Sequence, residues 1–378
     1  MNHYPSNVKE KLNSIILSMA EHHWLFSKNP GHDFTRQHLG KLSFYDTMRL
    51  IISMGKGSTN DEIMDYFDLD PDLIPSQSAF CQRRRQISLS AFEYLFSEFS
   101  SSFPSTTDKF KDHCILACDG CHVVYATNSD IIEDYNKPRL IDYKGYNHMH
   151  LNGFVDVISK AFLDVVIQPG QQPDEREALH SMLDHFTPDD PQKYIITADR
   201  GYKSYDLLFH CELKNLGYVF RVKSPSSPKS ILSYYASEFP DDLEEFDVTI
   251  KRFFTDKATN IMKSQSDVYR YINPSKNTPH FYELLRKKHS HLYFLQFRVV
   301  KIKTAENTYE YLITNLPFSF TLDDIRECYH WRWGIEISFR YLKHAAGLLY
   351  FHSKQPEFLK QEIYSRLILY NFGIFIAN

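Results

Sequence analysis

A chain of 378 residues is long for one domain and indicates two or three. Hydrophobic residues make up 43% of it, enough for a large core, and only 13 glycines argue against a glycine-rich nucleotide-binding fold. The net charge of −4 excludes a general electrostatic attraction to nucleic acid, so any such binding must use local basic patches.

Residues 1–108 are predicted to form a helical N-terminal domain. Apolar residues recur at helical spacing over 8–20, and Ser43 and Ser76 are suitable N-caps for two further helices. Another helix is expected to begin at Asn60. Prolines between the helix that begins at Asn60 and the helix capped by Ser76 mark a turn. This part of the domain is therefore predicted to be a helix, a turn and a second helix.

The helix after this turn carries three consecutive arginines, Arg83, Arg84 and Arg85. A turn between helices with a basic second helix resembles a DNA-binding arrangement, which makes these arginines candidate DNA contacts. The alternative is a solvated basic face on an ordinary helical bundle, because consecutive residues fan around a helix. The basic cluster is the one physical reason to expect DNA here.

Residues 109–224 change to β-prone runs that later alternate with helices. Runs joined by short turns predict an antiparallel meander, and the later alternation predicts a mixed α/β sheet, of which this segment is the first part. The expected strands are 113–118, 123–126, 148–158, 161–167, 194–198 and 218–222, with helices at 174–186 and 204–216.

A linker-like segment follows at Ser224, and residues 225–305 are charged and β-prone, which predicts a β-rich insertion into the α/β domain. Residues 306–378 form the second part of that domain and end in an apolar helix, which is consistent with a missing C-terminal segment. No apolar run reaches the about 20 residues of a membrane span. The N-terminus lacks a signal pattern, so we expect a soluble cytoplasmic protein that does not enter a membrane.

Three cysteines lie close together, at Cys114, Cys118 and Cys121, with a histidine on each side. They could form a zinc site. However, the segment alternates like a buried strand with a turn at Asp119–Gly120, and no second Cys/His pair follows at ligand spacing. Reduced cysteines in a core are therefore the favoured interpretation.

The helix predicted over 329–343 contains Tyr329, Arg332, Glu336 and Lys343 at offsets 0, 3, 7 and 14. At about 100° per residue, one continuous helix would project all four into an arc of roughly 60°. One carboxylate would thus share a stripe with two cations and a phenol. The alternative is an ordinary surface ion pair, which contributes only a few tenths of a kcal/mol.

Two aspartates, Asp119 and Asp199, each directly follow an apolar run. If the two strands are neighbours, their carboxylates lie side by side, and Glu336 can join them from a helix packed on the same sheet. Three oxygen ligands suit Mg²⁺ or Mn²⁺, and two such ions about 4 Å apart support in-line phosphoryl transfer. Arg332 and Lys343 would then bind neighbouring phosphates. Taken alone, Asp119 before a glycine is more typical of a turn.

Together these residues resemble the DDE transposases of bacterial insertion sequences, in the insertion-sequence-four-like group marked by Y-x2-R-x3-E-x6-K. The four signature positions are matched by Tyr329, Arg332, Glu336 and Lys343. The segments ACDG and TADRGY supply the two aspartates of the family pattern as Asp119 and Asp199. KGYNHMHLNGFVDV and TNLP are also like the family, and the resemblance covers roughly residues 36–378.

The resemblance implies a ribonuclease-H-like mixed sheet flanked by helices, preceded by a helical region and interrupted by a β-strand insertion before Glu336. It implies that Asp119, Asp199 and Glu336 hold two Mg²⁺ or Mn²⁺ ions. It also implies cleavage of double-stranded DNA at the terminal inverted repeats and transfer of the 3′-OH into target DNA. A homodimer assembled on DNA and a nucleoid-associated location in the bacterial cytoplasm are implied as well.

In relatives, cleavage passes through a DNA hairpin, and the signature tyrosine, arginine and lysine hold end phosphates. These roles are implied here for Tyr329, Arg332 and Lys343, and Arg200 beside the second aspartate is a further candidate DNA contact. Trp333 or Trp331 could stack on a flipped base. The alternative for both tryptophans is core packing, and for Trp331 the helical angle favours it.

Three alternatives stay open. The first is a truncated or decayed derivative that binds DNA without catalysis and acts as an inhibitor; relatives often continue past the position of the last residue here. The second is a ribonuclease-H-like nuclease that never joins strands. The third is a structural protein stabilised by zinc on Cys114, Cys118 and Cys121.

Overall fold

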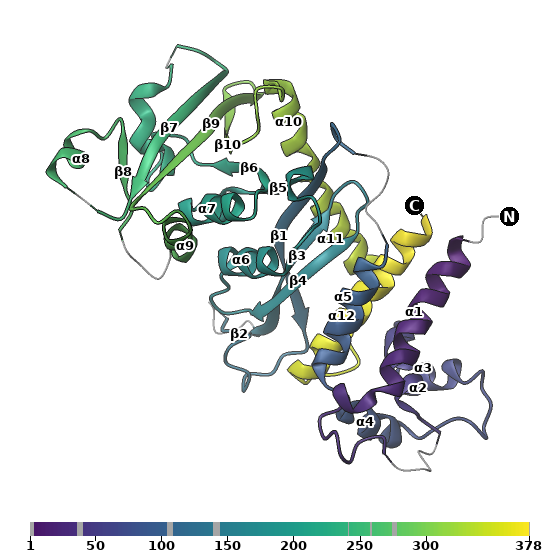
Figure 1. The fold of residues 1–378 in the computed structure, drawn as a ribbon. Coiled ribbons are helices and arrows are strands. Elements are labelled where there is room, and N and C mark those ends of the chain that lie inside the picture. Colours follow the sequence, from purple (N-terminus) through teal and green to yellow (C-terminus); the bar gives the residue numbers. More distant parts are fainter. Residues whose placement is uncertain are drawn as a thin grey trace.

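The computed structural model describes residues 4–35, 41–103, 109–138, 144–240, 242–257, 259–273 and 278–377. A ten-stranded sheet forms its centre, and helices lie on both faces of that sheet (Figure 1). Parallel and antiparallel pairs both occur in it. The predicted mixed α/β sheet flanked by helices is therefore confirmed.

The strands are β1 (Cys114–Tyr125), β2 (Tyr135–Asn136), β3 (Tyr146–Asp156), β4 (Phe162–Pro169), β5 (Tyr194–Ala198), β6 (Gly217–Val222), β7 (Phe246–Thr255), β8 (Tyr269–Tyr271), β9 (Leu292–Ala305) and β10 (Thr308–Thr314). Their order is β2-β3-β1-β5-β6-β10-β9-β7-β8, and β4 also pairs with β3. The expected antiparallel meander is present as β1, β3 and β4. β1, β5 and β6 are parallel neighbours.

The helices are α1 (Tyr4–Glu21), α2 (Phe44–Ser53), α3 (Thr59–Tyr66), α4 (Gln77–Gln86), α5 (Leu89–Ser101), α6 (Glu175–His185), α7 (Tyr205–Leu213), α8 (Asn260–Ser264), α9 (Pro279–Lys287), α10 (Leu322–Trp331), α11 (Gly334–His344) and α12 (Pro356–Ala377). Ser43 and Ser76 cap α2 and α4 as predicted, because each side chain accepts a hydrogen bond from a backbone N–H of the first turn. Among these described helices, none combines the length and apolar character that crossing a membrane requires.

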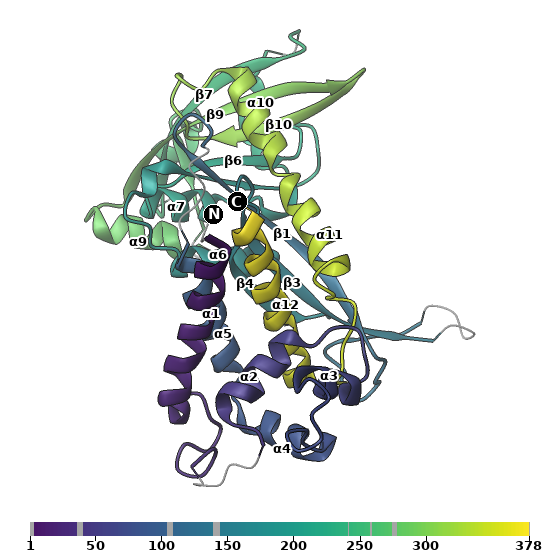
Figure 2. The same ribbon diagram turned by 90° about the vertical axis from the view of Figure 1, so that its right-hand side faces the viewer.

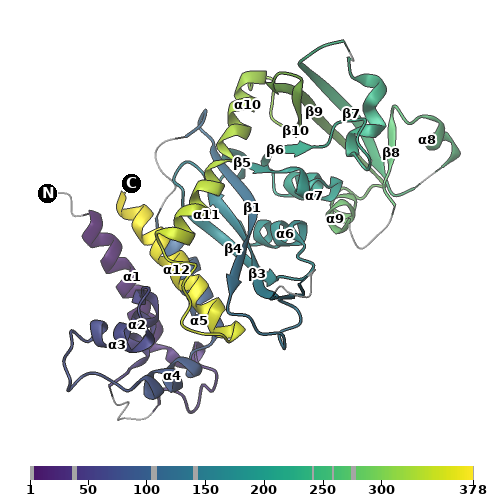
Figure 3. The same cartoon turned by 180° about the vertical axis from the view of Figure 1, so that it is seen from behind.

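Successive side chains of β1 alternate between two hydrophobic cores, as expected of a strand buried on both faces. Leu116 and Cys118 face a core that α6 and α7 complete, whereas Ile115 and Ala117 face a core that α10, α11 and α12 complete. Figure 3 shows α10, α11 and α12 lying along this second face. By the same alternation, Asp119 belongs to the face that carries α10 and α11.

The C-terminal helix α12 connects the N-terminal helices to the sheet. It packs against α1, α2 and α5, and also against α11 and β4 (Figure 2). Its apolar residues on several sides, such as Ile363 and Ile368, are fully buried, and they share one core with α1, α2 and α5. The helices of 1–108 therefore complete their core with a segment from the far end of the chain. The domain limit at residue 108 stays a prediction.

The segment 225–305 contains the strands β7, β8 and β9, as the sequence indicated, but they are not a sheet of their own. β10 pairs with β6 on one side and with β9 on the other, so the backbone hydrogen bonds run continuously from the core into this segment. The segment also contains α9, which sequence analysis missed and which packs against α7. Its limits as an inserted domain stay a prediction.

Candidate active site

Asp119 and Asp199 are neighbours at the end of β5. β1 and β5 are parallel, and the last pair in their register is Cys118 with Ala198. Asp119 directly follows Cys118 and Asp199 directly follows Ala198, so the two aspartates lie side by side. This adjacency was expected, but the expected turn at Asp119–Gly120 is wrong. β1 continues through both residues because β3 pairs with them in an unbroken register. Long-range pairing therefore overrides a local sequence that is typical of turns.

The helix that carries the signature residues is broken. α10 ends at Trp331 and α11 begins at Gly334, so the predicted continuous helix over 329–343 is wrong. At the break, the backbone N–H of Trp333 bonds to the carbonyl of His330, and that of Ile335 bonds to the carbonyl of Arg332. These are the tighter three-residue bonds of a 3-10 turn. The four signature residues consequently come from two helices and a turn, although Arg332 still contacts both Tyr329 and Glu336.

Arg332, at this break, lies between the acids. Its side chain is only 3% exposed, with Nη1 3.7 Å from Asp119 Oδ2 and Nη2 3.3 Å from Glu336 Oε1. Burial acts to lower the pKa of Arg332, but Tyr329, Asp199 and Asp119 outweigh burial and raise it. Asp119 from β1 and Glu336 from α11 thus share one buried guanidinium, and Asp199 at the end of β5 lies near enough to raise the pKa of Arg332.

The pKa values of the two aspartates are shifted in opposite directions. Burial raises the pKa of Asp119 to about 6, and the nearby carboxylates of Glu175 and Glu336 raise it further, against the Gly120 N–H and Arg332. Burial also acts on Asp199, but hydrogen bonds from Arg221 hold the pKa of Asp199 below its usual range. Asp119 therefore carries negative charge that its neighbours compensate incompletely.

Arg221, which was not among the residues predicted from the sequence, holds Asp199. Its Nε and Nη2 lie 2.5 and 2.9 Å from the two carboxylate oxygens, and its Nη1 contacts Glu310. The Tyr329 hydroxyl is 3.5 Å from Asp199 Oδ1. A lone arginine in the otherwise apolar run 218–222 was the available signal, but the sequence does not show that β6 lies beside β5.

Glu175 is a fourth acid near the site that sequence analysis missed. It is the first residue of α6, whose start is capped by Asp174. A Cβ on Gly120 would lie 2.9 Å from Glu175 Oε1 and 2.2 Å from His150 Nε2, so glycine at 120 allows both side chains to approach β1. The acidic start of the predicted helix 174–186 was visible, but its position beside Asp119 is decided by the packing of α6.

The predicted DNA contacts near the acids are accessible to different degrees. Arg200 is exposed and Lys343, on α11, is half-buried. Trp333 is 49% exposed and lies 5.1 Å from the Arg332 guanidinium, ring centre to Cζ. Core packing was the favoured expectation for Trp331, and it is wrong, since Trp331 is 39% exposed. That expectation used the angular position of Trp331 on one continuous helix, and the helix is in fact broken directly after Trp331.

The three arginines of α4 fan around the helix, and Arg84 is not available to DNA. Its side chain is buried against α12, with Nη1 2.8 Å from Glu362 Oε1 and Nη2 2.7 Å from the Phe358 carbonyl. The prediction that Arg84 contacts DNA is therefore wrong. Arg83 bonds to Gln86 and is half-buried, and Arg85 is exposed.

The cysteine cluster does not converge. Cys114, Cys118 and Cys121 are all buried in β1, but Cys118 and Cys121 belong to the two different cores on opposite faces of the sheet. Burial raises the pKa of the Cys121 thiol to about 12, so this thiol stays protonated. The zinc alternative for these cysteines is wrong, and reduced core cysteines are what the structure contains.

The acids fit a hard divalent cation chemically. Mg²⁺ and Mn²⁺ prefer carboxylate oxygens with open positions for water and phosphate. Asp119 and Glu336 have carboxylates that are 26% and 41% exposed, and Arg332 is the cation nearest to both. The raised pKa of Asp119 shows that further positive charge would be favourable there.

Comparison with known proteins identifies the family. No curated protein matches the chain. The cryo-EM structure of the piggyBac transposase synaptic complex with hairpin DNA aligns with a TM-score of 0.46 and 11% sequence identity, covering 100% of this chain and 73% of that one. A family model described as the transposase DDE domain matches residues 110–372. Because that match spans most of the chain, the protein belongs to the DDE-domain transposases, a family whose enzymes act in DNA transposition and recombination.

Proposed function

We propose that this chain is a transposase of the insertion-sequence-four-like group that cuts the ends of a mobile element and joins them to target DNA. The observation that supports this most is the meeting of Asp119, Asp199 and Glu336 around Arg332. These acids come from three separate elements, so the arrangement is not a by-product of one helix or one turn. The match of all four signature residues supports the same group.

We propose that Asp119, Asp199 and Glu336 hold two Mg²⁺ or Mn²⁺ ions. When bound, such ions activate the attacking oxygen and stabilise the leaving oxygen of an in-line displacement. Arg221 orients Asp199 through a two-point contact, which leaves one lone pair of Oδ2 for a ligand bond. Glu175 adds negative charge beside Asp119 and makes a cation more favourable there.

The accessible basic and aromatic residues around the acids are assigned to DNA. Lys343 and Arg200 bind phosphates next to the cleaved one. Arg332 and Tyr329 are buried and contact the acids, so we assign them to holding the acids in place. Trp333 is exposed beside the Arg332 guanidinium, where it can stack on an unpaired base. Arg85 and Arg83, on α4 at the other end of the molecule, bind DNA farther from the acids (Figure 1).

The reaction in this proposal has two phosphoryl transfers. Water attacks a phosphodiester at the element end, and the bond to the 3′ oxygen breaks, leaving a 3′-OH and a 5′-phosphate. That 3′-OH then attacks a phosphodiester of the target, or of the opposite strand to form a hairpin, and displaces another 3′ oxygen. A homodimer that holds both ends in the bacterial nucleoid would make the two joining events concerted.

The strand arrangement supports a ribonuclease-H-like core for this chemistry. An antiparallel meander of β1, β3 and β4 continues into the parallel strands β5 and β6. The first two acids lie on the central strands β1 and β5 of this unit, and the third comes from a helix packed on β1. Such a unit brings together acids that are distant in the chain.

The test is cleavage of a duplex that carries the terminal repeats found beside the gene. We expect nicking with Mg²⁺ or Mn²⁺, none with a chelator, and joined products when target DNA is added. Binding without nicking by the folded protein would favour the non-catalytic inhibitor. Robust nicking without any joined product would favour a nuclease that does not transfer strands.

The phosphate contacts predict a specific salt dependence. Lys343→Ala or Arg200→Ala should weaken binding to every duplex sequence and reduce the slope of log affinity against log salt by about 1. The reason is that each variant removes one neutralised phosphate and its released counterion. Fluorescence anisotropy at several salt concentrations measures the slope. Lys9→Ala, an exposed lysine on α1, is the control and should leave the slope unchanged.

A further inference from the structure

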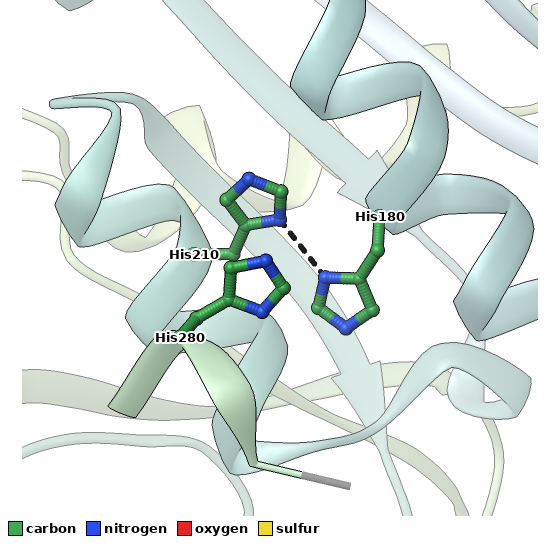
Figure 4. Close-up of side chains that lie close together, drawn as sticks. All are labelled: His180, His210 and His280. Atoms are coloured by element: carbon green, nitrogen blue, oxygen red, sulfur yellow. Dashed lines mark hydrogen bonds between the residues drawn. The ribbon is translucent and has the colours of Figure 1, made fainter. Parts of the chain in front are cut away.

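Three histidines meet on the face of the sheet opposite the catalytic acids. His180 is on α6, His210 on α7 and His280 at the start of α9, as Figure 4 shows. One nitrogen from each ring lies within 4.8 Å of the other two. In the described part of the chain, this is the group of histidine, cysteine and acidic side chains whose ligand atoms come close enough to hold one metal ion. The proposed transposase reaction does not use it.

Each ring turns one nitrogen toward a carboxylate. His280 Nδ1 is 2.7 Å from Asp206 Oδ2, and His210 Nε2 is 3.2 Å from Asp184 Oδ1. His180 Nε2 is 3.8 Å from Asp206 Oδ2. A histidine that binds a metal with one nitrogen generally gives the other N–H to a carboxylate or carbonyl, which sets the tautomer of the ring. His280 and His210 follow this pattern, whereas the 3.8 Å separation of His180 Nε2 from Asp206 is too long for a hydrogen bond.

Each ring keeps a second nitrogen that could bind a metal, although the three rings are stacked and would have to turn for their lone pairs to converge. His180 Nδ1 and His210 Nδ1 are 2.9 Å apart, and the carboxylate contact of His280 Nδ1 leaves Nε2 of that ring for a ligand. Two Zn–N bonds of about 2.0 Å at a tetrahedral angle span roughly 3.3 Å, so small ring rotations bring the pair to ligand spacing. The rings of His210 and His280 are nearly parallel, with centres 3.8 Å apart.

The rings are also in the protonation state that a ligand needs. Burial lowers the pKa of His180 to about 4, and the neighbouring His280 lowers it further. Burial likewise lowers the pKa of His210 to about 2, with repulsion from His280 and His180 as the next causes. At neutral pH both imidazoles are therefore uncharged and keep a lone pair for a metal.

We propose that His180, His210 and His280 form a structural site for Zn²⁺ or a similar transition-metal ion, separate from the catalytic ions. Imidazole nitrogens select zinc, nickel, cobalt or copper, whereas Mg²⁺ and Mn²⁺ prefer the oxygen ligands of the catalytic acids. Three nitrogens leave a fourth position, and the 61% exposure of the nearby Asp184 side chain shows that water reaches this edge. The bound ion would tie α9, from segment 225–305, to α6 and α7.

The experiment uses the full chain, stripped with a chelator and then titrated with Zn²⁺ in excess Mg²⁺. We expect about one zinc per chain after dialysis and a higher thermal unfolding midpoint with zinc than without. His180→Gln should lose the bound zinc and the midpoint shift. Asp184→Asn, a change at an exposed residue that keeps all three ligands, should weaken zinc binding about 10- to 100-fold.

Two control variants distinguish zinc at the three histidines from zinc bound elsewhere on the chain. His289→Asn changes an exposed histidine elsewhere and should bind zinc like the unmodified chain. Asp119→Asn should also keep its zinc, because the acids lie on the opposite face; loss of zinc there would place the ion at the acids and overturn the proposal. So would unchanged zinc binding in both His180→Gln and Asp184→Asn. Absence of any retained zinc in the unmodified chain would leave the histidines as a stacked, hydrogen-bonded cluster and end the proposal.

Discussion

Asp119→Asn is expected to lower the rate of DNA nicking by roughly a thousandfold or more and to leave the metal-free protein at least as stable. A metal ligand at the reacting phosphate is worth several kcal/mol in the transition state, and each 1.4 kcal/mol or so is tenfold in rate. Asparagine has almost the same shape as aspartate but cannot carry the charge. Single-turnover cleavage and thermal unfolding, each measured on the same preparation, give the two results.

The expected sign of the stability change comes from the pKa of Asp119. Folding raises this pKa from 3.8 to about 6, so the unfolded chain ionises first as the pH rises. Protonated Asp119 makes its full contribution to the free energy of unfolding below pH 3.8, and this contribution is lost as the pH rises to about 6. Asparagine does not ionise, so the variant does not lose this contribution as the pH rises. With a chelator present, the variant should gain stability relative to the unmodified chain between these pH values and keep that gain above them.

Asp164→Asn is the matched control for this prediction. Asp164 also has a pKa raised mainly by burial, but it lies on β4 beside His185 of α6, away from the three acids. Its variant should cut DNA at the rate of the unmodified chain. If Asp164→Asn and Asp119→Asn lost activity equally, the loss would reflect general damage to the fold, and Asp119 would not be assigned to the metal.

Arg84→Met is expected to destabilise the fold by about 3–5 kcal/mol, because it leaves a buried carboxylate without its cation. The Arg84 guanidinium is 2.8 Å from Glu362 and also donates to Gln361 and to the Phe358 carbonyl. These contacts join α4 to α12, so their loss would destabilise the packing of the N-terminal helices on α12. Urea unfolding followed by circular dichroism measures it.

Arg85→Met is the neighbouring control, since Arg85 is exposed on the same helix. It should change the free energy of unfolding by no more than about 0.5 kcal/mol, as surface substitutions usually do. The pair Arg84→Met with Glu362→Gln should recover part of the loss, because the second change removes the unpaired charge yet still accepts from the His352 N–H. Equal unfolding midpoints for Arg84→Met and Arg85→Met would contradict a structural role for Arg84.

Local chemistry was sufficient to determine several elements. Ser43 and Ser76 provide side-chain oxygens where α2 and α4 begin, because a helix start needs acceptors for its free N–H groups. The apolar run 194–198 was identifiable as a strand, and an aspartate directly after it was identifiable as a strand-end residue. The acids Asp119, Asp199 and Glu336, with their signature neighbours, were found from spacing and family resemblance, and the structure brings them together around Arg332.

Only the tertiary structure decided which of these residues are buried and what they contact. The turn expected at Asp119 became the middle of β1 because β3 pairs with β1 without a break from Leu116 to Tyr125, and the expected signature helix is broken at Arg332. The sequence did not reveal the contacts of Arg221, Glu175 and the histidines of α6, α7 and α9, because their partners are distant in the chain. Periodicity and capping report interactions within a few residues, whereas a site made from neighbouring strands and packed helices depends on contacts that no local pattern encodes.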